Sequence, residues 1–135
     1  MVRVLLDTNT CIEIVRGRRQ SITARIQQVG LDALSICSVV WAELLVGAHL
    51  SARGYEKEHA RIIRFLALPQ FPFDQKAAEH YARIRSHLQP LGQLIGERDM
   101  QIAAIARSRG LVLVTHNTNE LNRVPNLRLE DWEQS

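Results

Sequence analysis

Short aliphatic runs alternate along the chain with segments whose apolar residues recur every three or four positions. The aliphatic runs are typical of strands buried on both faces, and the periodic segments are typical of amphipathic helices. We predict strands at residues 2–6, 34–37 and 111–115, and a short final strand at 127–129. We predict helices at 11–16, in the segment that ends at Gly30, and at 39–50, 55–66, 75–88 and 98–109. This alternation indicates an α/β fold with a parallel central sheet flanked by helices.

Local signals place the ends of these elements. Asn9 or Thr10 can cap the first helix, and Asp74 can cap the helix at 75–88. Two prolines bound an extended link at residues 68–73. No repeat and no long linker divides the chain, so we predict a single domain over residues 1–135.

Composition excludes several classes of protein. The chain is 46% hydrophobic and 23% charged, a globular balance that excludes a disordered tail or a fibre. Asp7 interrupts the first apolar run, and no run approaches about 18 residues, so we expect neither a signal peptide nor a membrane span. Cys11 and Cys37 lack metal-ligand spacing and are expected to be reduced thiols of a cytoplasmic protein. The formal net charge of +3 is compatible with an anionic partner without requiring one.

Polar side chains follow two of the predicted strands at the point where each strand ends. Asp7 follows the strand at 2–6, and Asn117 lies just beyond the strand at 111–115. Ligands of parallel sheets bind beyond the carboxyl ends of the strands. We therefore expect both side chains to project over the same edge of the sheet.

Two acids also lie within the apolar stripes of predicted helices, Glu43 in the helix at 39–50 and Asp99 in the helix at 98–109. A buried carboxylate is costly unless it is ion-paired, protonated or bound to a cation. Three converging acids without an inward Lys or Arg nearby in the sequence favour a cation. Carboxylate and amide oxygens suit Mg²⁺, with Mn²⁺ as an alternative.

Each acid also has a purely structural interpretation. Asp7 can form an Asx turn that caps the next helix, and Asp99 can be a first-turn acid that favours the helix dipole. Glu43 has no such local role, although an Arg from elsewhere in the chain could pair with it. The convergence of the three acids is the argument for a functional site.

Four segments, in order along nearly the whole chain, carry a resemblance to a known family. They are LLDTNTCI, SVVWAELLVGA, IGERDMQIAAIARSRGLVLVTHNTNEL and RVPNLRLEDW. The chain resembles the PIN-domain family, specifically the VapC-type toxins of bacterial toxin–antitoxin pairs. The resemblance implies a PIN-like domain with ribonuclease activity.

The resemblance also implies roles for individual residues. Asp7, Glu43 and Asp99 match the family's acidic triad, which holds Mg²⁺ for RNA hydrolysis, and Asn117 matches the next polar position of the catalytic site. Thr8 and Thr115 would orient the acids through their hydroxyls, and Glu120 would assist. Relatives commonly carry Gly-Pro-Tyr-Asp before the third acid, whereas this chain has Gly-Glu-Arg-Asp at residues 96–99.

The family further implies an RNA substrate, a VapB-type antitoxin, a homodimer and a place in the bacterial cytoplasm. The branch with this N-terminal motif and the LEDW ending implies initiator tRNA, cut in its anticodon stem-loop. Arg16, Arg18, Arg19 and Arg98 are candidate contacts to RNA phosphates or to the antitoxin. The first three could instead form a solvated helix face, and Arg98 could form an ion pair with Glu97 or Asp99.

Two other functions fit parts of the sequence. An aspartyl phosphatase would use Asp7 as its nucleophile, but such enzymes usually carry a second Asp two residues later, where this chain has Asn9. A non-catalytic module that binds RNA or protein on the same fold is the alternative from another class.

We also expect His116 to be a neutral histidine on the surface or beside the site rather than a general base.

Overall fold

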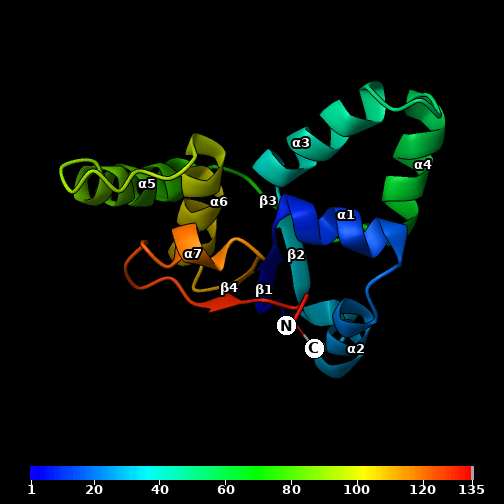
Figure 1. Cartoon of the computed structure of the whole chain (residues 1–135), viewed down its shortest axis with the longest axis horizontal. Coiled ribbons are helices and arrows are strands. Elements are labelled where there is room, and N and C mark those ends of the chain that lie inside the picture. Colours follow the sequence, from blue (N-terminus) through cyan, green and yellow to red (C-terminus); the bar gives the residue numbers. More distant parts are fainter. Residues whose placement is uncertain (135) are drawn as a thin grey trace.

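A five-stranded parallel sheet forms the centre of the computed structural model, which describes residues 1–134 (Figure 1). The strands lie in the order β3-β2-β1-β4-β5. Their bounds are β1 Val4–Leu6, β2 Leu34–Cys37, β3 Gln70–Phe71, β4 Val112–Val114 and β5 Leu129–Glu130. The prediction of an α/β fold with a parallel sheet is confirmed. Ser135, the last residue of the predicted domain, lies outside the described residues.

Helices occupy the connections between the strands. They are α1 Thr8–Arg16, α2 Gln20–Val29, the 3₁₀ helix η1 Leu31–Ala33, α3 Ser38–His49, α4 Tyr55–Phe65, α5 Gln75–Leu88, α6 Glu97–Ser108 and α7 Thr118–Leu121. Figure 1 shows α5 extending away from the sheet beside α6, while α3 and α4 form an arch over α1 on the opposite side of the molecule. The segment after β5 contacts α2, since the Ser21 hydroxyl donates to the Glu133 carbonyl oxygen at 3.3 Å.

The order of the strands creates a switch point between β1 and β4. From β1 the chain moves outward through β2 to β3, then returns to place β4 on the other side of β1. The register pairs Leu5 with Leu113, and Leu6 with Val114. Because both strands run in the same direction, the residues that follow them meet at one edge of the sheet. Ligand sites of open parallel sheets form at such a switch point.

The central strands are buried on both faces, as their aliphatic sequences predict. Leu5, Leu6 and Leu113 are inaccessible to solvent, and each contributes about 1.5–3 kcal/mol by its burial. Cys11 is equally inaccessible, and burial is the main cause that raises the pKa of its thiol. This agrees with a free cysteine that packs as a small apolar residue.

Several element boundaries differ from the predictions. Helix α1 begins at Thr8 because Asp7, rather than Asn9 or Thr10, is its cap. The predicted link at 68–73 contains the edge strand β3, whose two residues pair with Ile36 and Cys37. The final strand lies at Leu129–Glu130 rather than at 127–129, and α7 was not predicted. None of the helices within residues 1–134 combines the length and the apolar character needed to cross a bilayer.

Candidate functional site

Asp7 links the end of β1 to the start of α1. Its Oδ1 accepts a hydrogen bond from the backbone N–H of Thr10 at 2.9 Å, which satisfies a free donor of the first helical turn. Its own N–H donates to the carbonyl oxygen of Val114 at the end of β4, at 3.1 Å. The residue is only 9% exposed. The capping role is therefore real, and it fixes the carboxylate at the switch point.

Glu43 reaches the same region from α3. Its Oε1 accepts a hydrogen bond from the Thr8 hydroxyl at 2.8 Å, and its Oε2 lies 3.6 Å from a guanidinium nitrogen of Arg98. The Glu43 side chain is 26% exposed and that of Arg98 is 74% exposed. The arginine that could pair with Glu43 is thus Arg98. The alternative ion pair of Arg98 with Glu97 or Asp99 does not form within residues 1–134, and Arg98 pairs with Glu43 instead.

Asp99, Asn117 and Glu120 form a hydrogen-bonded group. The Asn117 side-chain amide donates to Asp99 Oδ2 at 3.3 Å and to Glu120 Oε2 at 3.2 Å. The Asn117 backbone N–H donates to the buried Thr115 hydroxyl oxygen at 3.0 Å. The short loop after β4 therefore holds its amide against an acid presented by the first turn of α6.

The electrostatics connect these side chains into one cluster. Burial raises the pKa of Asp99 above its ordinary value of 3.8, and the hydrogen bond from Asn117 partly offsets that effect. The negative charges of Asp7, Glu120 and Glu43 raise the pKa of Asp99 further. Three carboxylates from other places in the sequence thus act on Asp99, and together with burial they disfavour its ionised state.

The predicted basic contacts lie in different places. Arg98 is the one that reaches an acid of the cluster. Arg16 and Arg19 instead pair with Glu13 on α1, at 3.4 and 3.5 Å. Arg18 is exposed at the turn before α2. Among the candidates, the structure therefore joins only Arg98 to the acids.

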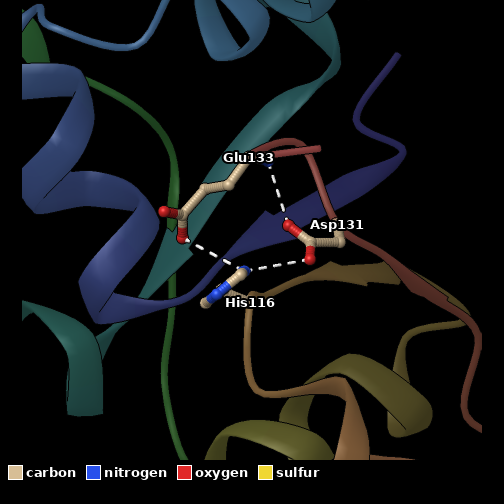
Figure 2. A group of neighbouring side chains, drawn as sticks. All are labelled: His116, Asp131 and Glu133. Atoms are coloured by element: carbon tan, nitrogen blue, oxygen red, sulfur yellow. Dashed lines mark hydrogen bonds and ion pairs between the residues drawn. The ribbon is translucent and has the colours of Figure 1, made fainter. Parts of the chain in front are cut away.

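The side chains that pair with Glu97 and His116 were not predicted from the sequence. Glu97 accepts a hydrogen bond from the Tyr81 hydroxyl at 3.0 Å and lies 3.7 Å from Arg85, both on α5. His116 lies against Asp131 and Glu133 of the C-terminal segment (Figure 2). These contacts join residues 12 to 17 positions apart on different elements, so no local sequence pattern reports them.

A groove of about 400 Å³ adjoins Glu43 between α1, α3 and α4. Apolar side chains supply much of its wall: Ile12, Val15, Leu44, Ala48 and Ile62. Charged groups lie among them, including Arg16 and Arg61. The groove therefore combines an apolar wall with charged side chains of both signs, and one of the clustered acids, Glu43, is part of its lining.

Comparison with known proteins gives the family. The PIN domain matches residues 4–127. The tRNA(fMet)-specific endonuclease VapC of Salmonella typhimurium is 37% identical over 133 residues, covering 98% of this chain and 99% of the relative. Ribonuclease VapC2 of Haemophilus influenzae is 38% identical over 134 residues, with the same coverage.

Solved structures agree with this relationship. A DNA-bound VapBC structure from Salmonella typhimurium has a TM-score of 0.90 at 37% identity, and covers 98% of this chain and 99% of the matched chain. VapBC2 from Rickettsia felis, bound to a promoter DNA fragment, has a TM-score of 0.88 at 31% identity with the same coverage. The chain belongs to the PIN-domain family and, within it, to the VapC group.

Proposed function

We propose that the chain is a Mg²⁺-dependent endoribonuclease, the toxin of a toxin–antitoxin pair. The observation that carries this proposal is the convergence of Asp7, Glu43 and Asp99 at the β1/β4 switch point, where burial and then the charges of the neighbouring carboxylates raise the pKa of Asp99. The names of the VapC relatives support the same reaction class.

The donor set fits a hard divalent cation. The three acids offer only oxygen ligands, and Asn117 adds an amide beside them. Within residues 1–134, the one cationic side chain paired with a member of this triad is Arg98, which is largely exposed and lies 3.6 Å from Glu43. A divalent cation would offset the electrostatic repulsion between Asp99 and the neighbouring carboxylates. Mg²⁺ is the ion we propose, and Mn²⁺ could replace it.

When bound, such an ion supplies an activated water and neutralises charge that develops on the phosphodiester. The chain's own residues orient the ligands. The helix cap fixes one Asp7 oxygen, the Thr8 hydroxyl holds Glu43, and Asn117 holds Asp99. The Thr115 hydroxyl fixes the backbone of Asn117, and Glu120 accepts a second hydrogen bond from the Asn117 side-chain amide. These contacts reduce the reorganisation needed for reaction.

We propose initiator tRNA, cut in its anticodon stem-loop, as the substrate, since two relatives are named tRNA(fMet)-specific endonucleases. Arg98, which is largely exposed, pairs with Glu43 and directly precedes Asp99, is our first candidate for a contact to an RNA phosphate. Arg18 is an exposed second candidate, whereas Arg16 and Arg19 would have to exchange their bonds to Glu13 for RNA.

A VapB-type antitoxin is the proposed protein partner. Structures of VapBC assemblies from relatives support this choice. The groove between α1, α3 and α4 suits a partner segment with apolar side chains, and Glu43 is among the residues that line it. We also propose a homodimer, which sedimentation at several protein concentrations tests directly.

The substrate proposal is tested with antitoxin-free protein, purified tRNAs and sequencing of the cleaved ends. We expect one cut in the anticodon stem-loop of initiator tRNA, with elongator methionine tRNA left intact at the same enzyme concentration. Equal cleavage of both tRNAs would contradict the proposed specificity. Binding of RNA in EDTA, with no cleavage in Mg²⁺, would instead support a non-catalytic binding module.

A further inference from the structure

A second group of metal-ligating side chains lies outside the acidic cluster. His116, in the loop between β4 and α7, faces Asp131 and Glu133 of the segment after β5 (Figure 2). Its Nδ1 lies 3.0 Å from Asp131 Oδ2 and 3.7 Å from Glu133 Oε2. One ligand atom from each residue lies within 4.8 Å of the other two. Within residues 1–134 this is the group that meets this distance, and the triad of Asp7, Glu43 and Asp99 does not.

The remaining oxygen of each carboxylate is held by another donor. Asp131 Oδ1 accepts a hydrogen bond from the backbone N–H of Glu133 at 2.9 Å. Glu133 Oε1 lies 3.3 Å from a guanidinium nitrogen of Arg19. Each acid therefore presents its other oxygen toward His116. Outer contacts of this kind orient the ligands of metal sites.

Within residues 1–134, Arg19 is the one permanently charged cation that pairs with this group. The side chains of Asp131 and Glu133 are each only 9% exposed, so leaving them uncompensated is costly. Arg19 is shared between Glu133 and Glu13. In the described part of the chain, the sole ionic partner of Asp131 is His116, whose imidazole is charged only if protonated. A divalent cation between the three side chains would neutralise both acids while the imidazole stays neutral.

We propose that His116, Asp131 and Glu133 bind a transition-metal dication of the Zn²⁺ type. One imidazole nitrogen with two carboxylate oxygens is a zinc donor set, whereas the oxygen-only acidic cluster suits Mg²⁺. Tetrahedral Zn²⁺, with bonds of about 2.0–2.2 Å, places neighbouring ligand atoms roughly 3.3 Å apart. The separations of 3.0 and 3.7 Å lie on either side of that value. Three protein ligands leave the fourth position to water.

Such an ion would join two segments that are distant in the sequence. It would bind the C-terminal segment after β5 to the loop that carries Asn117 immediately after His116. Because the ion would bind the folded state, it would stabilise the fold by mass action. The expected role is therefore structural, and it does not depend on ribonuclease activity.

The test uses untagged protein that is stripped of metal and then titrated with Zn²⁺. Millimolar Mg²⁺ is present throughout, so that Mg²⁺ and not Zn²⁺ occupies the acidic cluster. We expect one tight equivalent of Zn²⁺ per chain and a melting temperature that rises with the concentration of free Zn²⁺. Co²⁺, used as a spectroscopic probe, is expected to give the visible bands of a tetrahedral site.

Variants distinguish Zn²⁺ binding at this group from metal binding at the acidic cluster. Asp131→Asn retains an acceptor for the Glu133 N–H, so it is expected to fold, as far-ultraviolet circular dichroism would show, and to lose the Zn²⁺ equivalent. His116→Ala is expected to lose it as well. The controls are His87→Ala, which removes an exposed histidine of α5, and Asp7→Asn in the acidic cluster, and both should keep it. Absence of Zn²⁺ binding in the wild type, unchanged binding in Asp131→Asn and His116→Ala, or its loss in Asp7→Asn would overturn the proposal.

Discussion

The Thr8 hydroxyl donates a 2.8 Å hydrogen bond to Glu43 Oε1 across 35 positions of sequence. Thr8 is the first residue of α1, and Glu43 lies in the second turn of α3. The residue directly after Asp7 therefore orients the acid supplied by the next βα unit. This contact joins Glu43, a member of the proposed metal site, to the residue that directly follows Asp7, another member.

Replacement of Thr8 by Val removes that hydroxyl while keeping nearly the same shape. We expect cleavage to fall on the order of tenfold, since losing an outer contact to a metal ligand costs about 10–100-fold in affinity or activity. The melting temperature should change little. Thr23→Val, at an exposed threonine of α2, is the matched control and should retain full activity. Equal rates for wild type and Thr8→Val would show that the bond does not matter for catalysis.

Asp7 has a capping role that can be separated from its charge. Asp7→Ala removes the acceptor for the Thr10 N–H and should lower the free energy of unfolding by about 0.5–2 kcal/mol. Asp7→Asn retains an acceptor and should remain close to the wild type in stability. Urea denaturation in EDTA measures both. A loss as large in Asp7→Asn as in Asp7→Ala would contradict the capping account.

The raised pKa of Asp99 predicts a pH-dependent cost to stability. Because the folded state holds the Asp99 proton to higher pH than the unfolded chain, unfolding becomes easier as the pH rises from the ordinary value of 3.8 through the raised pKa. In EDTA, Asp99→Asn should therefore melt at a higher temperature than the wild type at pH 7. The difference should shrink as the pH is lowered toward 4.

The exposed Asp32 provides the control for this effect. Asp32→Asn should show no comparable gain in melting temperature at pH 7. A wild type at least as stable as Asp99→Asn at pH 7 in EDTA would contradict the electrostatic account of the cluster.

Arg98 is expected to contact the substrate backbone. Arg98→Gln should weaken RNA binding and lower the slope of log K against log salt concentration by about one, as for the loss of one phosphate contact. Stability should barely change, because the Glu43–Arg98 pair is largely exposed on the arginine side. Arg83→Gln, at an exposed residue of α5, is the control. An unchanged salt slope in Arg98→Gln would remove Arg98 from the RNA interface.

The main elements of the fold follow from the sequence because their signals are local. Buried parallel strands leave continuous aliphatic runs, and helices show spacing of three or four with a stop at Gly17 or Gly30. The edge strand β3 escaped prediction because its two residues lie between prolines and form a strand only by pairing with β2. Helix α7 escaped because four residues are too few to show a helical period.

The candidate site was predictable in its members but not in its contacts. Strand order decides that Asp7 and Asn117 share one edge, and the alternating pattern of strands and helices already favoured that arrangement. The partner of Arg98 could not be read from the sequence, because Glu43 lies 55 positions away and the nearer acids Glu97 and Asp99 offered simpler pairs. The packing of α6 against α3 decides that choice.

The most direct test of the proposed activity compares tRNA cleavage by the wild type and Asp7→Asn, each free of antitoxin, in Mg²⁺ and in EDTA. We expect a discrete cut by the wild type in Mg²⁺ alone. Asp7→Asn, which keeps the helix cap, should be slower by about 100-fold or more, because a metal contributes several kcal/mol and each 1.36 kcal/mol is a factor of ten. Undiminished cleavage by the wild type in EDTA, or by Asp7→Asn in Mg²⁺, would contradict a metal-dependent nuclease built on this acidic cluster.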